Sequence, residues 1–172
     1  IMGMGLPTTA AYVLVAAVLA PAMTAVGVSP LAAHLFVFYF ATISVITPPV
    51  CVAVFVGAGI ANTNWLPAAG HAVRLGAVTY LVPFLLLLYP GMLMEGGPLS
   101  IVQAALSGAV LVFAVPAILT GAPLIGSRPI DTILLSIVIA LALWPNPITP
   151  ILALALYFGA RKLGQRKKES LA

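Results

Sequence analysis

Long apolar stretches, separated by short polar or proline-rich breaks, run through nearly the whole chain. About 20 consecutive apolar residues are enough for a helix to cross a bilayer. The pattern therefore predicts an all-α integral membrane protein whose helices are joined by short turns. The expected helical stretches are residues 8–28, 31–46, 50–61, 72–94, 101–119, 130–144 and 151–160.

The composition supports a membrane protein and excludes an ordinary soluble one. The chain is 63% hydrophobic and 6% charged, with a mean hydropathy of +1.22, whereas about 25% of the residues in a soluble domain are charged. The net charge of +4 does not indicate nucleic-acid binding, because the basic residues are not spread over a folded face. Most of them form a tail after the last apolar stretch, which indicates the cytoplasmic side of a membrane. The tail residues are Arg161, Lys162, Arg166, Lys167 and Lys168.

Two proline-interrupted breaks lie inside very apolar sequence: the opening stretch Gly3–Thr9, and Thr47-Pro48-Pro49. The second break divides an apolar run, residues 31–61, that as one helix would reach about 46 Å against a hydrocarbon core of about 30 Å. Adjacent prolines remove two backbone donors and disfavour helical geometry in the residue before them. We therefore expect two half-helices, residues 31–46 and 50–61, as in the discontinuous helices of secondary transporters.

Hydroxyl side chains stand beside both breaks. Broken helices persist in a bilayer where their freed backbone groups are buried in protein or line a polar cavity. Freed carbonyls and neutral hydroxyls are suitable ligands for a dehydrated cation such as sodium, and half-helix N-termini favour an anionic substrate. No carboxylate lies nearby in the sequence to make this a proton site instead. The residues expected at the cation site are Gly3, Gly5, Thr8, Thr9, Ser44 and Thr47, and those expected beside the substrate are Pro7, Pro48 and Pro49.

A simpler alternative is that the hydroxyls only bond back to the carbonyls of their own helices. A single break would leave the two interpretations open. Two breaks, spaced as a hairpin tip followed by a broken helix, favour the cation site.

The sequence shows no constellation of catalytic or metal-binding residues. The three acids share no segment with a histidine, and His34 and His71 lack the spacing of metal ligands. Cys51 is the only cysteine, which excludes an intrachain disulfide and a cysteine-based metal motif. We therefore expect neither an enzyme nor a cofactor, apart from sodium as the coupling ion.

Local signals predict how the first two helices begin and end. A hydroxyl of Thr8 or Thr9 is expected to cap the first helix, and Gly27 to end it. Ser29 is expected to cap the second helix, with Pro30 at the first helical position, where its missing N–H costs nothing.

Further along the chain, residues 62–65 are expected to form a polar turn. Residues 72–94 are expected to form one plain spanning helix, in which Pro83 is a tolerated kink. Residues 120–129 form a predicted Gly/Pro-rich loop.

The last apolar region contains a break with three prolines, Pro145–Pro150. It allows either two short antiparallel segments, residues 130–144 and 151–160, or one long kinked helix. If the basic tail is cytoplasmic, two segments also place Arg74 and Arg128 inside. The positive-inside rule therefore favours two segments.

Four stretches together resemble the large membrane subunit of the tripartite ATP-independent periplasmic (TRAP) transporters, and most of all its TAXI subtype, in which small and large membrane subunits are often fused. Their order and spacing match as well as their composition. The likeness covers residues 1–94, and residues 95–172 resemble a C-terminal membrane extension only loosely. The four stretches are Gly3–Tyr12, Ala32–Phe40, Ser44–Pro49 and Gly57–Ala61.

The resemblance implies an elevator-type, cation-coupled importer of small organic anions in a bacterial inner membrane. A periplasmic binding protein would deliver the substrate, and a small membrane subunit, separate or fused upstream, would complete the permease. The stretch Gly3–Thr9 would be the tip of the second re-entrant hairpin, residues 10–28 its return helix, and Thr47-Pro48-Pro49 the break facing that tip.

By this likeness the chain is expected to be the C-terminal part of a longer polypeptide and to contain only the second of two inverted repeats. It departs from the pattern at Leu6, where many relatives outside this subtype carry an acidic residue, which bears on the coupling ion. The alternatives are another ion-coupled carrier with the same hairpin-and-break plan, or a membrane scaffold that transports nothing.

Overall fold

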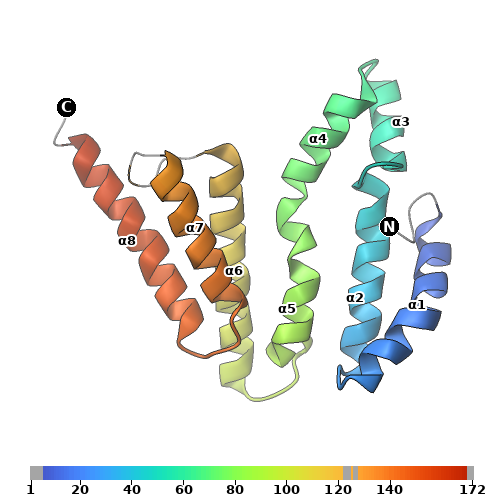
Figure 1. Ribbon diagram of the computed structural model, residues 1–172, viewed down its shortest axis with the longest axis horizontal. Coiled ribbons are helices and arrows are strands. Elements are labelled where there is room, and N and C mark those ends of the chain that lie inside the picture. Colours follow the sequence, from blue (N-terminus) through green and yellow to red (C-terminus); the bar gives the residue numbers. More distant parts are fainter. Residues whose placement is uncertain (1–5, 122–124, 126–127, 170–172) are drawn as a thin grey trace. The chain divides into compact units, whose positions relative to one another are not determined.

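The computed structural model describes residues 6–121, 125 and 128–169, and their side chains as far as Leu163. Within these residues all regular structure is helical, which confirms the all-α fold (Figure 1). The chain divides into two compact units, Ile1–Leu87 and Leu88–Ala172.

The first unit is built from two helix pairs and a short-helix segment. Helix α1 packs along α2, and α3 packs along α4 (Figure 1). The α2 helix continues into the short 3₁₀ helix η1, and a second 3₁₀ helix, η2, leads from α4 into α5. The bounds are α1 Thr8–Ala25, α2 Pro30–Ile43, η1 Ser44–Ile46, α3 Val52–Ile60, α4 Trp65–Leu75, η2 Ala77–Tyr80 and α5 Val82–Leu88.

The second unit contains one long helix and two shorter ones. Helix α6 (Pro98–Thr120) packs against α7 (Arg128–Leu143), α8 (Thr149–Glu169) and the 3₁₀ helix η3 (Pro90–Leu93). The α7 and α8 helices are separate and pack on each other, so the prediction of two segments rather than one kinked helix is confirmed. The expected end of the second segment at residue 160 is wrong, because α8 continues to Glu169 through residues such as lysine, arginine and glutamine that favour helices.

Hydrogen bonds hold the turn between α7 and α8. The buried Tyr89 hydroxyl lies 2.8 Å from the carbonyl oxygens of both Ala142 and Trp144, at the end of α7. The Thr149 hydroxyl donates to the Trp144 carbonyl, also at 2.8 Å. A prolyl turn has few backbone donors of its own, so these side chains bind carbonyls in the last turn of α7, at Ala142, and directly after the helix, at Trp144.

Small side chains dominate the contact between α1 and α2. The buried residues of α1 are Ala11, Ala16 and Ala20, and those of α2 include Ala32, Ala33 and Ala41. Helices in a membrane gain little from hydrophobic association, so they associate where small residues let their backbones approach closely.

The predicted end signals hold for α2 but not for the start of α1. The Ser29 side chain accepts a hydrogen bond from the Ala32 N–H at 3.2 Å, and Gly27 adopts φ +95° after α1. The prediction that Thr8 or Thr9 caps α1 is wrong, because Pro7 occupies the cap position and makes no side-chain hydrogen bond. Both threonines already lie inside the helix, beyond the position from which a hydroxyl can reach the first free N–H groups.

The prediction of one plain helix over residues 72–94 is also wrong. The helix stops at Leu75, and the two parts Trp65–Leu75 and Ala77–Leu88 are bent by 65°. Gly76 ends the first part, and the Thr79 hydroxyl donates to the Gly76 carbonyl at 2.5 Å. Pro83 is the second residue of α5, where its missing N–H breaks no helical bond, so it helps to begin a helix rather than to kink one.

Two helices in the described part of the chain are long and apolar enough to cross a membrane, α1 and α6. The bent pair of α4 with η2 and α5 becomes a third if it counts as one span. The segment of α2 with η1, Pro30–Ile46, is apolar but shorter. The chain is therefore an all-α membrane protein.

We expect Gly91→Ala to destabilise the second unit. A Cβ on Gly91 would overlap the backbone carbonyl of Ser100, so η3 and α6 would have to separate. Overpacking of this kind costs about 2 kcal/mol, which would lower the thermal midpoint in detergent by several degrees. Gly97→Ala is the matched control, because its Cβ would meet no atom within 4 Å. Equal midpoints for the two variants would contradict this packing.

Candidate functional site

The predicted break is present between η1 and α3. The 3₁₀ helix ends at Ile46, Thr47 is extended (φ −97°, ψ 124°), and α3 does not begin until Val52. The Pro48–Pro49 peptide bond is cis, and Cys51 adopts φ +27° at the N-terminal cap of α3. The prediction of two half-helices is therefore confirmed.

Two backbone carbonyls at the end of η1 lack hydrogen-bond partners. The donors that a helix would supply to the Val45 carbonyl belong to Pro48 and Pro49, and neither proline has an N–H. Among the described residues, neither this carbonyl nor that of Ile46 accepts a hydrogen bond outside the helical pattern. The break therefore exposes two carbonyl dipoles inside an apolar segment.

The first N–H groups of α3 are also unpaired in the part of the chain that the structure describes. The Val54 and Phe55 N–H groups bond to the Cys51 carbonyl, whereas Val52 and Ala53 have no such partner, and Cys51 provides no side-chain cap. A helix N-terminus carries a partial positive charge. Carbonyl oxygens and N–H groups thus lie on the two sides of one break.

The hydroxyls predicted at this break are engaged with backbone. The Ser44 hydroxyl donates to the Ala41 carbonyl at 2.7 Å, and the Thr47 hydroxyl donates to the Ile43 carbonyl at 2.8 Å. Both hydroxyl protons are therefore used in hydrogen bonds to the carbonyls of the same helical segment, as the simpler alternative expects. Each oxygen still has lone pairs that can accept from a donor or coordinate a cation.

Tyr80 reaches this site and was not predicted from the sequence. Its hydroxyl lies 2.7 Å from the Thr47 hydroxyl, and since Thr47 gives its proton to Ile43, Tyr80 is the donor. The bend at Gly76 places Tyr80 there, and a Cβ on Gly76 would lie 3.0 Å from the Ile46 side chain. The only signal in the sequence was a tyrosine next to a threonine within an apolar stretch.

The predicted hairpin tip is Gly3–Thr9, and the structure describes its residues 6–9. These residues lie at the same end of the α1–α2 pair as the break. The Tyr12 hydroxyl is 2.9 Å from His34 Nδ1, and the Tyr12 ring contacts that of Phe38. Thr8 lies one helical turn closer to the break than Tyr12 does. The remaining distance between Thr8 and Thr47, measured along the helix axis, is roughly 10 Å. Among the described residues neither Thr8 nor Thr9 has a hydrogen-bond partner for its hydroxyl.

The remaining tip residues are placed as follows. Pro7 precedes α1 with φ −54° and ψ 142°, and its carbonyl accepts from the Ala11 N–H at 2.9 Å. Gly3 and Gly5 lie outside the described residues. Their predicted part in the cation site stays a prediction.

Helices long enough to span a membrane, beside a helix interrupted so that its backbone groups are free, are typical of integral membrane transporters. The sequence model of one transporter family, described as "Tripartite ATP-independent periplasmic transporter, DctM component", matches residues 1–96. This is more than half of the chain, and the chain belongs to this family. The family is one of transporters and not of enzymes. Neither a curated protein nor a solved structure matches the chain.

Proposed function

We propose that the chain is a permease component of a cation-coupled secondary importer of small organic anions. The observation that carries the proposal is the break at residues 47–51, where two carbonyls and a hydroxyl oxygen are available inside an apolar segment. Membership of the DctM family supports the same function.

Sodium is the proposed coupling ion because the donors are neutral oxygens. The first acidic residue in the sequence is Glu95, so no carboxylate from residues 1–94 can carry a proton or neutralise a divalent ion. Carbonyl and hydroxyl oxygens suit a monovalent cation that has shed its water. The proposed ligands at the break are the hydroxyls of Ser44 and Thr47 and the freed carbonyls of Val45 and Ile46. Gly3, Gly5, Thr8 and Thr9 of the tip would complete the site in a conformation that brings the tip toward the break, because Thr8 lies roughly 10 Å from Thr47 along the axis in this structure.

The proposed substrate is an organic anion that binds beside the cation. The free N–H groups of Val52 and Ala53 give the start of α3 a positive field, and a cation at the other side of the break would add to it. Pro7, Pro48 and Pro49 would shape the walls of the site. Simultaneous binding of opposite charges would couple the two fluxes, because each ligand lowers the electrostatic cost of the other.

The proposed partners follow from the family. We propose a periplasmic binding protein that delivers the substrate, and a small membrane subunit that is separate or fused upstream. We further propose that the chain is the C-terminal, TAXI-type part of a permease in a bacterial inner membrane, and that an inverted repeat elsewhere in the polypeptide supplies the other half of the site.

Reconstituted transport tests this function. The complete permease would be placed in proteoliposomes with its binding protein and labelled substrate, under an inward sodium gradient or an equal potassium gradient. Uptake that requires both the binding protein and sodium would support the proposal. Equal uptake under the two gradients would favour another coupling ion, and no uptake under any gradient would favour the membrane scaffold.

We expect the loop before α7 and the basic tail to lie on the same, cytoplasmic side of the membrane. The helices α7 and α8 are separate and packed together, so the chain enters at Arg128 and returns at residues 145–148. A reporter fused after Arg128 should therefore be active only in its cytoplasmic form, as should one fused after Ala172. Periplasmic activity of the first fusion would contradict the placement of this loop and the tail on the same side of the membrane.

A further inference from the structure

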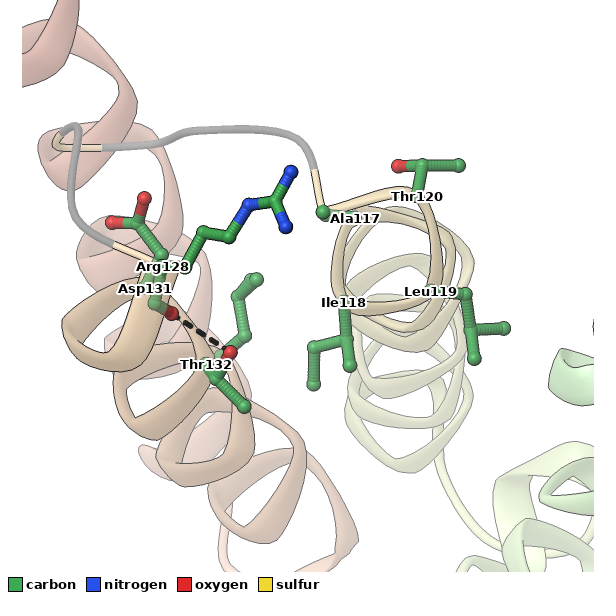
Figure 2. A pocket seen from close by; sticks show the side chains of 9 residues that line it. Ala117, Ile118, Leu119, Thr120, Arg128, Asp131 and Thr132 are labelled. Carbon is green, nitrogen blue, oxygen red and sulfur yellow. Dashed lines mark hydrogen bonds between the residues drawn. The ribbon is translucent and has the colours of Figure 1, made fainter.

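A pocket in the second unit lies between the C-terminal end of α6 and the first turns of α7 (Figure 2). Its volume is about 320 Å³. The α6 side contributes mostly apolar side chains, and the α7 side contributes polar and charged ones. The lining residues used below are Ile118, Thr120, Arg128, Asp131, Thr132 and Leu135.

The length of α6 places this pocket at the membrane surface. With 23 mostly apolar residues, α6 is about 34 Å long and matches a hydrocarbon core of about 30 Å. Its last residue, Thr120, therefore lies at the level of the lipid headgroups. A phosphate is the group that a phospholipid presents at this depth.

Arg128 supplies a free cation at the pocket. Figure 2 shows its side chain extending from the start of α7 toward the end of α6. It is exposed, and among the described residues its guanidinium forms neither a hydrogen bond nor an ion pair. Guanidinium groups bind phosphate with two parallel hydrogen bonds, which a lysine cannot reproduce.

The buried acid beside Arg128 has a different task. Asp131 is 4% exposed, and its Oδ1 accepts a hydrogen bond from the Ile125 N–H at 2.9 Å, so it fixes the chain that enters α7. The Thr120 and Thr132 hydroxyls donate to the carbonyls of Pro116 and Arg128 in their own helices. Arg128 is therefore the group that is available to an anion.

We propose that this pocket binds the headgroup of a membrane phospholipid, with the phosphate on Arg128 and the glycerol and first acyl carbons over Ile118 and Leu135. The site is in the second unit and does not depend on the proposed transport function. The competing explanation is that Arg128 only compensates the negative end of the α6 dipole.

The test compares ligands that differ only in the headgroup. The full-length protein, delipidated in a maltoside detergent, would be titrated with dioleoyl phosphatidylglycerol and with dioleoylglycerol, and bound lipid counted by native mass spectrometry. We expect dioleoylglycerol to bind at least about tenfold more weakly. Arg128→Gln should lower the affinity for phosphatidylglycerol by a similar factor, whereas Arg74→Gln, another exposed arginine, should leave it unchanged. A soluble competitor, glycerol 3-phosphate, should displace the lipid only at a large excess.

Three outcomes would overturn the proposal. Equal binding of the two lipids by the unaltered protein would show that no headgroup site exists, and this comparison needs no variant to fold. Retained binding in Arg128→Gln would place the lipid elsewhere. Displacement by glycerol 3-phosphate at concentrations equal to those of the lipid would identify a soluble phosphate compound as the ligand.

Discussion

Replacing Pro48 and Pro49 together with alanine should strongly reduce uptake by the complete permease while leaving membrane insertion intact. The two alanines would restore the N–H donors that the Val45 carbonyl lacks, and would remove the steric bias against helical geometry at Thr47. The segments η1 and α3 could then join as one helix. The carbonyls proposed as cation ligands would accept hydrogen bonds within that helix and would no longer be free to bind an ion. Losing hydrogen-bonding or ligand contacts to a charged group costs about 1.5–3 kcal/mol each, so uptake should fall by roughly tenfold to a hundredfold or more.

The measurement is the initial rate of sodium-driven uptake, normalised to the amount of permease in the membrane. Pro98→Ala is the matched control, because Pro98 is an exposed proline at the first position of α6 and its loss frees or blocks no carbonyl at the break. Normal uptake by the double variant would show that the break is only structural. Failure of the double variant to reach the membrane would show that the break is needed for folding, contrary to the expectation.

Thr47→Val should raise the sodium concentration that half-saturates uptake by about tenfold. Valine keeps the branched shape of threonine but removes the oxygen that we propose as a ligand, and it also leaves the Tyr80 hydroxyl without its partner. Thr47→Ser is the matched control, because serine keeps the hydroxyl and should keep the sodium dependence. Thermal unfolding of both variants separates a loss of the ligand from a loss of stability.

Tyr80 gives this prediction a second test. Tyr80→Phe keeps the Thr47 oxygen but removes the hydrogen bond that orients it, so the half-saturating sodium concentration should shift by less than in Thr47→Val. If Thr47→Val and Thr8→Val both left the sodium dependence unchanged, the proposed cation site would be wrong. A shift in Tyr80→Phe as large as that in Thr47→Val would show that the Tyr80 hydroxyl matters as much for sodium binding as the Thr47 oxygen does.

The features that could be predicted from the sequence are those that covalent chemistry fixes locally. Pro48 and Pro49 remove two successive N–H donors and disfavour helical geometry at Thr47, which interrupts the helix, whereas the single prolines Pro21 and Pro116 are accommodated inside α1 and α6. Ser29 followed by Pro30 begins α2 for similarly local reasons, and Gly27 supplies the positive φ that ends α1.

The features that were missed depend on contacts between distant residues. A glycine alone does not predict the bend at Gly76, because isolated glycines are also tolerated inside membrane helices. Here the Ile46 side chain, 30 residues earlier in the sequence, packs close to Gly76. Tyr80 donates to a threonine 33 residues earlier, a pairing that no local pattern specifies. The α1 cap was mispredicted for the opposite reason: Thr8 is a favourable cap by type, but Pro7 already holds the position before the helix.

The residue types of the candidate site could therefore be predicted from the sequence, whereas the arrangement of their hydrogen bonds could not. The position of the break and the presence of free oxygens follow from the prolines and hydroxyls. Which oxygen keeps an unused lone pair depends on which carbonyl takes the hydroxyl proton, and this required the positions of Ile43 and Tyr80.

Equilibrium binding of sodium to the purified complete permease is the sharpest test of a cation site at the broken helix, because it depends on neither the substrate nor the binding protein. Titration calorimetry in potassium-free buffer would be performed on the unaltered protein, Thr47→Ser and Thr47→Val. We expect saturable sodium binding to the first two proteins, and binding about tenfold weaker to the third. Undiminished sodium binding by Thr47→Val, or no saturable binding by the unaltered protein, would contradict a cation site at the broken helix.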